Sequence, residues 1–144
     1  MPGVLAAVDD EDYIRCTLNS WTLTEGRAVT TIEGKQVKLH RFILPNIEKI
    51  DHRDGNQLNC CKSNLRAATQ SQNMSNRDKT AANTSGYKGV TWCKTKKRWK
   101  AQVMHQYTNV NCGYHDTPEA AALAYNAKAK LFHGEFAKLN KVSQ

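Results

Sequence analysis

Short runs of β-type residues alternate with turn signals in the first third of the chain. The runs cover 21–24, 28–32 and 37–44 and are rich in β-branched residues. A polar residue followed by glycine separates each run from the next, which marks tight turns. Pro45 ends the last run, since proline cannot donate to a strand ladder. This pattern predicts a small antiparallel meander, preceded by a short helix that an acidic run at 9–12 begins and that extends to about Cys16.

The next region, 47–78, has a polar loop between two short apolar pieces. Ile50 leads into Asp51 and His52, and a polar loop with one glycine follows. A short strand is expected over 64–68, and a helix from Gln70 to Asn76. The predicted order is therefore strand end, loop, returning strand and helix.

The last region, 87–144, predicts a sheet followed by a helix. Strands are expected over 87–93 and 98–103, and a third within 107–114. Polar and apolar residues alternate along the middle strand. One face of the strand therefore carries Arg98, Lys100 and Gln102, and the other face carries Trp99, Ala101 and Val103. The small polar stretch 79–86 is typical of a linker.

The helix of this region has a clear start and end. Thr117 is a good N-cap, Pro118 suits the first helical position, and Gly134 suits the end. The spacing predicts an apolar face that packs on the sheet, made of Ala120, Leu123, Ala124, Ala127 and Leu131. Together these patterns predict an α+β chain, with a first region over 1–78 and a three-stranded antiparallel sheet packed on one helix over 87–144.

Charge separates the two halves. The net charge is +8, yet residues 1–76 hold nine Lys/Arg and nine Asp/Glu, whereas 77–144 hold twelve and four. Such a basic half is typical of a surface that binds nucleic-acid phosphates. Solubility is the alternative explanation, but it gives no reason for the charge to lie in one half.

Several classes of protein are disfavoured. There is no run of 18 apolar residues and no basic, apolar leader, so we expect a cytoplasmic protein without a membrane partner. The five cysteines are odd in number, and no pair has the C-x-x-C spacing. We therefore expect free thiols rather than a disulfide framework or structural zinc.

The residues with candidate chemistry lie between His40 and Asn76. Asp51 offers the hard oxygen ligands that magnesium or manganese prefers, and His52 can exchange a proton near neutral pH. Asn64 and Asn73 are neutral amides in a stretch with few acids. Taken alone, an Asp-His pair is more often a surface or capping pair, and asparagines usually mark turns.

The pattern as a whole resembles the HNH homing endonucleases of phages and introns. The resemblance lies in residues 39–41, 50–56, 62–66 and 72–76, with further similarity at 8–13 and Trp21. It implies a ββα-metal core over about 38–77. Cys60 and Cys61 depart from it, because they stand in a loop where the family often has asparagine or arginine.

The resemblance implies a role for each residue of the set. His52 is expected to be the general base, with Asp51 and Asn73 holding Mg (or Mn). Asn64 is expected to orient the imidazole of His52 by accepting its other N–H. His40 and Arg41 either steady the scissile phosphate or only pack the meander, and the two alternatives stand about even.

The last region is similar to the plant ethylene-response-factor, or Apetala-type, DNA-binding domain. The similarity lies in residues 85–90, 98–101, 113–121, 124–126 and 139–140. It implies a three-stranded sheet that binds duplex DNA and is backed by one helix. Thr91, Cys93 and Asn111 depart from the plant contact residues, so the plant target sequence is not carried over. The expected DNA contacts, including two from the nuclease region, are Arg41, Arg66, Lys88, Lys94, Lys96, Lys97, Arg98, Lys100 and Gln102.

The sequence therefore predicts a site-directed, homing-type DNA endonuclease, encoded by a phage or mobile element and acting in a bacterial host. One active site per chain allows nicking by a monomer or a double-strand break by a homodimer. The alternative is a DNA-binding transcriptional regulator with a vestigial nuclease fold. A purely structural interaction protein would leave the basic half unexplained.

Overall fold

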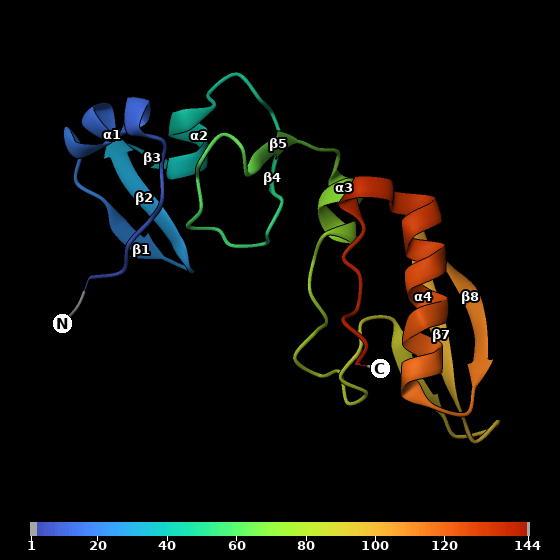
Figure 1. Cartoon of the computed structure of the whole chain (residues 1–144). Coiled ribbons are helices and arrows are strands. Elements are labelled where there is room, and N and C mark those ends of the chain that lie inside the picture. Colours follow the sequence, from blue (N-terminus) through green and yellow to red (C-terminus); the bar gives the residue numbers. More distant parts are fainter. Residues whose placement is uncertain (1–2, 144) are drawn as a thin grey trace. The chain divides into compact units, whose positions relative to one another are not determined.

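A computed structural model of the chain describes residues 3–143, and Figure 1 labels its elements. The chain divides into two units, Met1–Thr69 and Gln70–Gln144. The division falls ahead of the helix that contains Asn73, whereas the sequence placed the end of the nuclease region at residue 78. Within the part of the chain that the structure describes, no helix has the length and apolar character needed to cross a membrane.

The first unit begins with helix α1 (Asp10–Thr17) and a three-stranded meander. Its strands are β1 (Thr22–Thr24), β2 (Arg27–Ile32) and β3 (Lys35–Lys38), paired antiparallel in the order β1-β2-β3. The glycines of both turns have positive φ, 75° at Gly26 and 76° at Gly34. Glycine takes this conformation without steric cost, so the local sequence sets these turns. The predicted meander is confirmed.

The third β-type run does not stay extended. Residues Leu39–Ile43 form the short helix α2, so the strand prediction over 37–44 is wrong beyond Lys38. Leu39 and Ile43 are only 4% and 3% exposed and belong to the same core cluster. A helix places residues four apart on one face about 6 Å from each other, whereas a strand would separate them by about 13 Å. Burial of both residues in one small core therefore favours the helix.

The core of the first unit joins these elements to the hairpin that follows. Buried together are Cys16, Ala28, Leu39, Ile43, Cys60 and Leu65. Strands β4 (Ile50–His52) and β5 (Leu65–Ala67) pair antiparallel across the long loop 53–64. The register places Asp51 opposite Arg66 and His52 opposite Leu65. The predicted strand, loop and returning strand are thus present.

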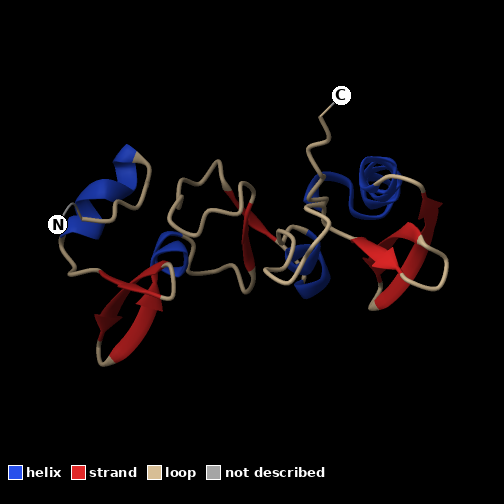
Figure 2. Cartoon of the chain, turned by 90° about the horizontal axis from the view of Figure 1, so that it is seen from below, coloured by secondary structure: helices blue, strands red, loops and turns tan. Residues whose placement is uncertain are grey.

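The second unit contains helix α3 (Gln70–Ser75), a sheet and a long helix. The sheet has the antiparallel order β6-β7-β8, with β6 (Val90–Cys93), β7 (Arg98–His105) and β8 (Thr108–His115). Helix α4 (Pro118–His133) lies on this sheet, and a short 3₁₀ turn, η1 (Gly134–Phe136), follows it (Figures 1 and 2). The α+β class and the three-stranded sheet packed on one helix are confirmed.

The face that α4 presents to the sheet differs from the predicted one. Ala121, Ala122, Tyr125 and Ala129 are buried, while Leu123 and Leu131 are 57% and 72% exposed. The reason lies at Gly89, where a Cβ atom would come within 2.2 Å of the Tyr125 ring. The absence of a side chain at Gly89 leaves room for this ring, which is buried on the same side of the helix as the alanines, and the leucines lie outward. The start of the helix is as predicted, because Thr117 Oγ1 accepts a hydrogen bond from Ala120 N at 3.2 Å.

The stretch predicted to be a linker lies within the second unit and is hydrogen-bonded to the start of its sheet. Ser85 Oγ lies within hydrogen-bonding distance of the carbonyl oxygens of Tyr87 and Val90, at 3.0 and 2.8 Å, and its single proton can be donated to either. Asn83 Nδ2 donates to Tyr87 O at 2.7 Å. These bonds tie the last residues of 79–86 to the start of the sheet.

Candidate active site

Asp51 and His52 are neighbours on β4, but their side chains meet different partners. Successive residues of a strand point to opposite faces. Asp51 contacts Arg66, its register partner on β5, whereas His52 contacts His40 and Cys60. The structure therefore brings the predicted residues together in two separate pairs of the first unit, Asp51 with Arg66 and His52 with His40.

The Asp51 carboxylate is paired with Arg66 inside the protein. Oδ2 of Asp51 accepts from Arg66 Nε at 2.8 Å, and Arg66 Nη2 lies 2.7 Å from the same oxygen. The two side chains are 8% and 7% exposed. A buried charge needs such a partner, because removing it from water is costly. The pair holds Asp51 in place, and a DNA contact by Arg66 would require this pair to open.

His52 is a buried imidazole, 3% exposed. Its Nε2 lies 3.8 Å from the sulfur of Cys60, and its ring meets the edge of the His40 ring at a centroid distance of 5.1 Å. Burial lowers the pKa of His52, and the nearby carboxylates of Asp51 and Asp54 oppose this shift. The ring is therefore neutral near neutral pH, which is the form that can accept a proton.

His40 lies on α2 beside this ring. Burial, followed by the His52 ring and nearby cations such as Lys38, lowers the pKa of His40 to about 4. Its neighbour Arg41 donates to the carbonyls of Ile47 and Glu48 and so holds the chain that enters β4. Contacts of His40 and Arg41 with a phosphate remain predictions.

Asn64 holds the loop between the two strands. Its Oδ1 accepts from Asp54 N at 3.1 Å, and its Nδ2 donates to Asp54 Oδ1 and to Asn59 O, both at 2.9 Å. These hydrogen bonds go to the loop and not to the imidazole of His52. The loop they stabilise begins directly after His52.

Asn73 is on α3 and is half-buried. This helix is grouped with the second unit. Its role as a metal ligand therefore stays a prediction from the resemblance.

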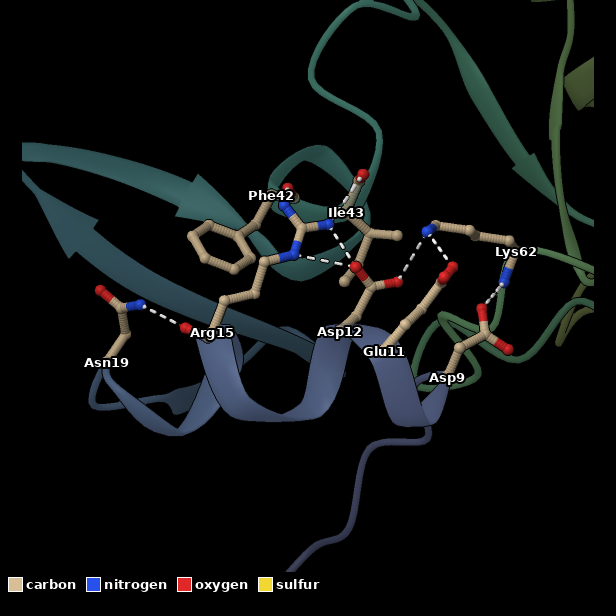
Figure 3. Close-up of polar contacts among 8 residues, drawn as sticks. All are labelled: Asp9, Glu11, Asp12, Arg15, Asn19, Phe42, Ile43 and Lys62. Atoms are coloured by element: carbon tan, nitrogen blue, oxygen red, sulfur yellow. Dashed lines mark hydrogen bonds and ion pairs between the residues drawn. The ribbon is translucent and has the colours of Figure 1, made fainter.

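The acidic residues at the start of α1 do more than begin a helix. Asp9, Glu11 and Asp12 bring carboxylate oxygens within 4.8 Å of one another. Lys62 Nζ pairs with Glu11 and Asp12, while Lys62 N donates to Asp9 Oδ2 at 2.8 Å (Figure 3). Arg15 also pairs with Asp12, which is 3% exposed. These cations balance the carboxylates, so the cluster fastens α1 to the loop 53–64. The Asp9 side chain makes no N-cap bond and binds this loop instead.

The candidate DNA contacts of the second unit fall into two groups. The outer face of the sheet holds Arg98, Lys100 and Gln102, opposite the buried Ala101 and Val103, as the alternation predicted. The exposed lysines of the turn between β6 and β7 form the second group. Two of these cations have partners: Lys96 lies over the Tyr114 ring, and Arg98 of the sheet face pairs with Asp116 at 3.2 Å.

Lys88 stands apart from this set. It is half-buried, and its Nζ donates to the carbonyls of Ser75 and Arg77 at the end of α3. Burial lowers the pKa of Lys88 to about 8. Its contacts favour a structural role, and binding to DNA remains a prediction.

Cys60 was not among the predicted site residues, although the sequence marked it as a departure from the resemblance. It is 1% exposed and touches His52. Adjacent cysteines in a polar loop give no signal of their own for such a contact. All five cysteines are free thiols, and Cys16 is the other buried one.

Two viral proteins are similar to this chain. Protein 3.8 of Escherichia phage T7 is 37% identical over 95 residues, which cover 66% of this chain and 78% of that protein. A protein of Acanthamoeba polyphaga mimivirus, named "Uncharacterized HNH endonuclease L560", is 31% identical over an alignment that covers 97% of this chain and 76% of that protein. No family model and no solved structure matches the chain. The similarity to the mimivirus protein spans both units and shows that the chain belongs to the HNH endonuclease family.

Proposed function

We propose that this chain is a metal-dependent endonuclease that hydrolyses phosphodiester bonds of double-stranded DNA, with His52 as the general base. The observation that carries the proposal is the buried, neutral imidazole of His52, which directly follows the fixed carboxylate of Asp51 on β4 in a member of the HNH family. A general base must be unprotonated at working pH, and burial keeps His52 so.

In the proposed reaction His52 takes a proton from the attacking water while the water oxygen attacks phosphorus. The bond between phosphorus and the 3′-oxygen of the neighbouring sugar breaks without a covalent enzyme intermediate, and the leaving oxygen takes a proton from solvent. The resemblance implies 5′-phosphate and 3′-hydroxyl ends. His40 contacts the ring of His52 edge-on at 5.1 Å and restricts how that ring can turn.

The proposed metal ligands are Asp51 and Asn73. Carboxylate and amide oxygens are the donors that Mg²⁺ and Mn²⁺ prefer, so the residue types fit. A bound ion would supply charge stabilisation for the leaving oxygen. Arg66 holds Asp51 Oδ2 in the described structure, and an ion at that oxygen would compete with the guanidinium.

Asn64 supports the site through the loop that follows His52. Its three hydrogen bonds to Asp54 and Asn59 fix the first turn of this loop. We assign it this supporting role in place of the contact with the imidazole that the resemblance implied.

In this proposal the second unit supplies most of the DNA-binding affinity. Residues 77–144 hold twelve Lys/Arg against four Asp/Glu, and the outer face of β7 is polar and basic. Exposed lysines at the turn between β6 and β7 suit contacts with phosphates, which position a protein without reading sequence. The Apetala-type assignment, the homing role and action in a bacterial host belong to the same proposal. That both similar proteins are viral supports a phage or virus origin.

Incubation of supercoiled plasmid with the protein tests the proposal. We expect nicked or linear product with Mg²⁺ or Mn²⁺, and none with a chelator. The His52→Ala variant should cut on the order of 10²-fold or more slowly than wild type. His115→Ala, which changes a histidine of the second unit, is the matched control and should cut normally.

Mapping the ends by sequencing distinguishes nicking from a double-strand break. Binding without cleavage of any DNA, including genomic DNA of the host, would support the regulator alternative. Equal cutting by His52→Ala and wild type would contradict the mechanism.

A further inference from the structure

The sulfur of Cys60 lies between the imidazole of His52 and a backbone carbonyl. Sγ is 3.8 Å from His52 Nε2 and 3.7 Å from Gln57 O. These are hydrogen-bond distances for sulfur, whose bonds are longer than those of oxygen. Cys60 is 1% exposed, so both contacts are made away from water.

Which group donates in each of the two contacts follows from the number of protons that the thiol and its partners carry. A thiol carries one proton, and a carbonyl oxygen can only accept. Both contacts are therefore satisfied in one arrangement alone, in which the thiol donates to Gln57 O and its sulfur accepts from His52 Nε2–H. Burial raises the pKa of the Cys60 thiol to about 12, so the proton needed for the first bond is present.

A neutral imidazole has one N–H and one lone pair. With the hydrogen on Nε2, the lone pair lies on Nδ1. Which nitrogen carries the proton is set by the partner of the other nitrogen. The partner at Nε2 thus selects the nitrogen that accepts the proton of the attacking water.

We propose that Cys60 is a positioning residue that holds His52 in the Nε2–H tautomer and so presents Nδ1 as the proton acceptor. The proposal rests on the proposed function of His52. It gives a role to one of the two residues, Cys60 and Cys61, at which this chain departs from the HNH pattern. It also places the orienting contact at Cys60, whereas Asn64 is engaged by the loop.

The experiment compares Cys60→Ala, which removes the thiol, with Cys60→Ser, which keeps a donor and acceptor. Cys16→Ala is the matched control, because it removes the other buried thiol of the same core without touching His52. The tautomer of His52 is read in the intact protein labelled with ¹⁵N-histidine, from long-range ¹H–¹⁵N correlations. The His52 signals are assigned by their loss in His52→Gln.

We expect the Nε2–H tautomer in wild type, Cys60→Ser and Cys16→Ala, and a mixture of both tautomers in Cys60→Ala. In plasmid cleavage, kcat of Cys60→Ala should fall on the order of tenfold, as is typical when the group that orients a site residue is removed. KM should not change, because Cys60 is buried and cannot meet DNA. Cys60→Ser should recover most of the activity.

Three results would overturn the role of Cys60. They are an Nδ1–H tautomer in wild type, an unchanged tautomer and kcat in Cys60→Ala, and equal decreases of kcat in Cys60→Ala and Cys16→Ala. Thermal melts of each variant verify that it is folded at the assay temperature. If wild type cuts no DNA at all, the proposed function fails, and the tautomer comparison still decides whether Cys60 sets the ring.

Discussion

The two units of this chain bury different kinds of residue. In the first unit, the buried polar and charged residues are Asp12, Thr30, Asp51, His52, Asn64 and Arg66. In the second, Asn76 is the one such residue among those described, and the core is made of alanine, valine and aromatic side chains. Charge shows the opposite trend, since the first unit is neutral and the second carries the whole net charge.

This contrast separates two ways of using polar groups. A buried imidazole or carboxylate has a fixed orientation and an environment that selects one protonation state, which suits proton transfer. Exposed lysines keep their charge and their freedom, which suits contacts with phosphates on many DNA sequences. We therefore propose that proton transfer takes place in the first unit and that most of the DNA affinity comes from the second.

The largest expected effect separates cutting from binding. His52→Ala should lower the cleavage rate by on the order of 10²–10⁴-fold, the usual contribution of a general base. Its affinity for a short duplex, measured by fluorescence anisotropy, should match wild type because His52 is buried. A decrease in affinity as large as the decrease in rate would contradict the separation of roles.

The buried ion pair gives the next effect. Arg66→Met leaves the Asp51 carboxylate buried without its partner and should lower the free energy of unfolding by about 3–5 kcal/mol. Urea denaturation measures this. The exposed pair of the second unit is the matched control: Arg98→Met breaks a pair whose side chains are 55% and 82% exposed. It should cost less than about 1 kcal/mol. Similar decreases in the free energy of unfolding for the two variants would contradict the distinction between a buried ion pair in the first unit and an exposed one in the second.

The turn between β6 and β7 offers a test of affinity. Lys94→Ala combined with Lys97→Ala should weaken DNA binding at low salt. The slope of log K against log salt should become shallower by about 0.9 for each phosphate that the variant no longer neutralises. Lys79→Ala combined with Lys141→Ala removes the same charge elsewhere in the second unit and serves as control. Equal effects of both double variants would mean that net charge, not this turn, binds DNA.

The last expected effect concerns pH. The pKa of His40 is about 4 in the folded protein against 6.5 for an ordinary histidine. Between these values the unfolded chain binds a proton that the folded one does not, so stability falls as pH falls from about 6.5 to 4. His52 shifts in the same direction and adds to the decrease. His40→Gln should reduce the slope of unfolding free energy against pH, measured by urea denaturation across this range, and an unchanged slope would contradict it.

Local sequence was sufficient for much of the fold. Glycines with positive φ at Gly26 and Gly34 set the turns of the meander. Alternation by two along β7 predicted the correct buried face, and Thr117 began α4 as expected. These features depend on residues close together in the chain, so their pattern can be read directly.

Contacts between distant residues were beyond that pattern. The leucines of α4 have the spacing of a packing face, but Gly89 leaves room for the ring of Tyr125 and the leucines lie outward. The sequence predicted Lys88 and Arg66 as DNA contacts, and it gave no sign of the partners that these two side chains have in the structure. Their partners, the carbonyls at the end of α3 and the Asp51 carboxylate, are 11–15 residues away.

By itself, then, the sequence determined the order of elements, the α+β class, the uneven distribution of charge and the Asp51-His52 pair with its resemblance to HNH endonucleases. The tertiary structure alone decided which partners surround those two residues. Asp51 pairs with Arg66, His52 contacts His40 and Cys60, and Asn64 is hydrogen-bonded to the loop. Local pattern sets turns and periodicity, whereas the environment of a buried side chain is set by segments that meet only when the chain folds.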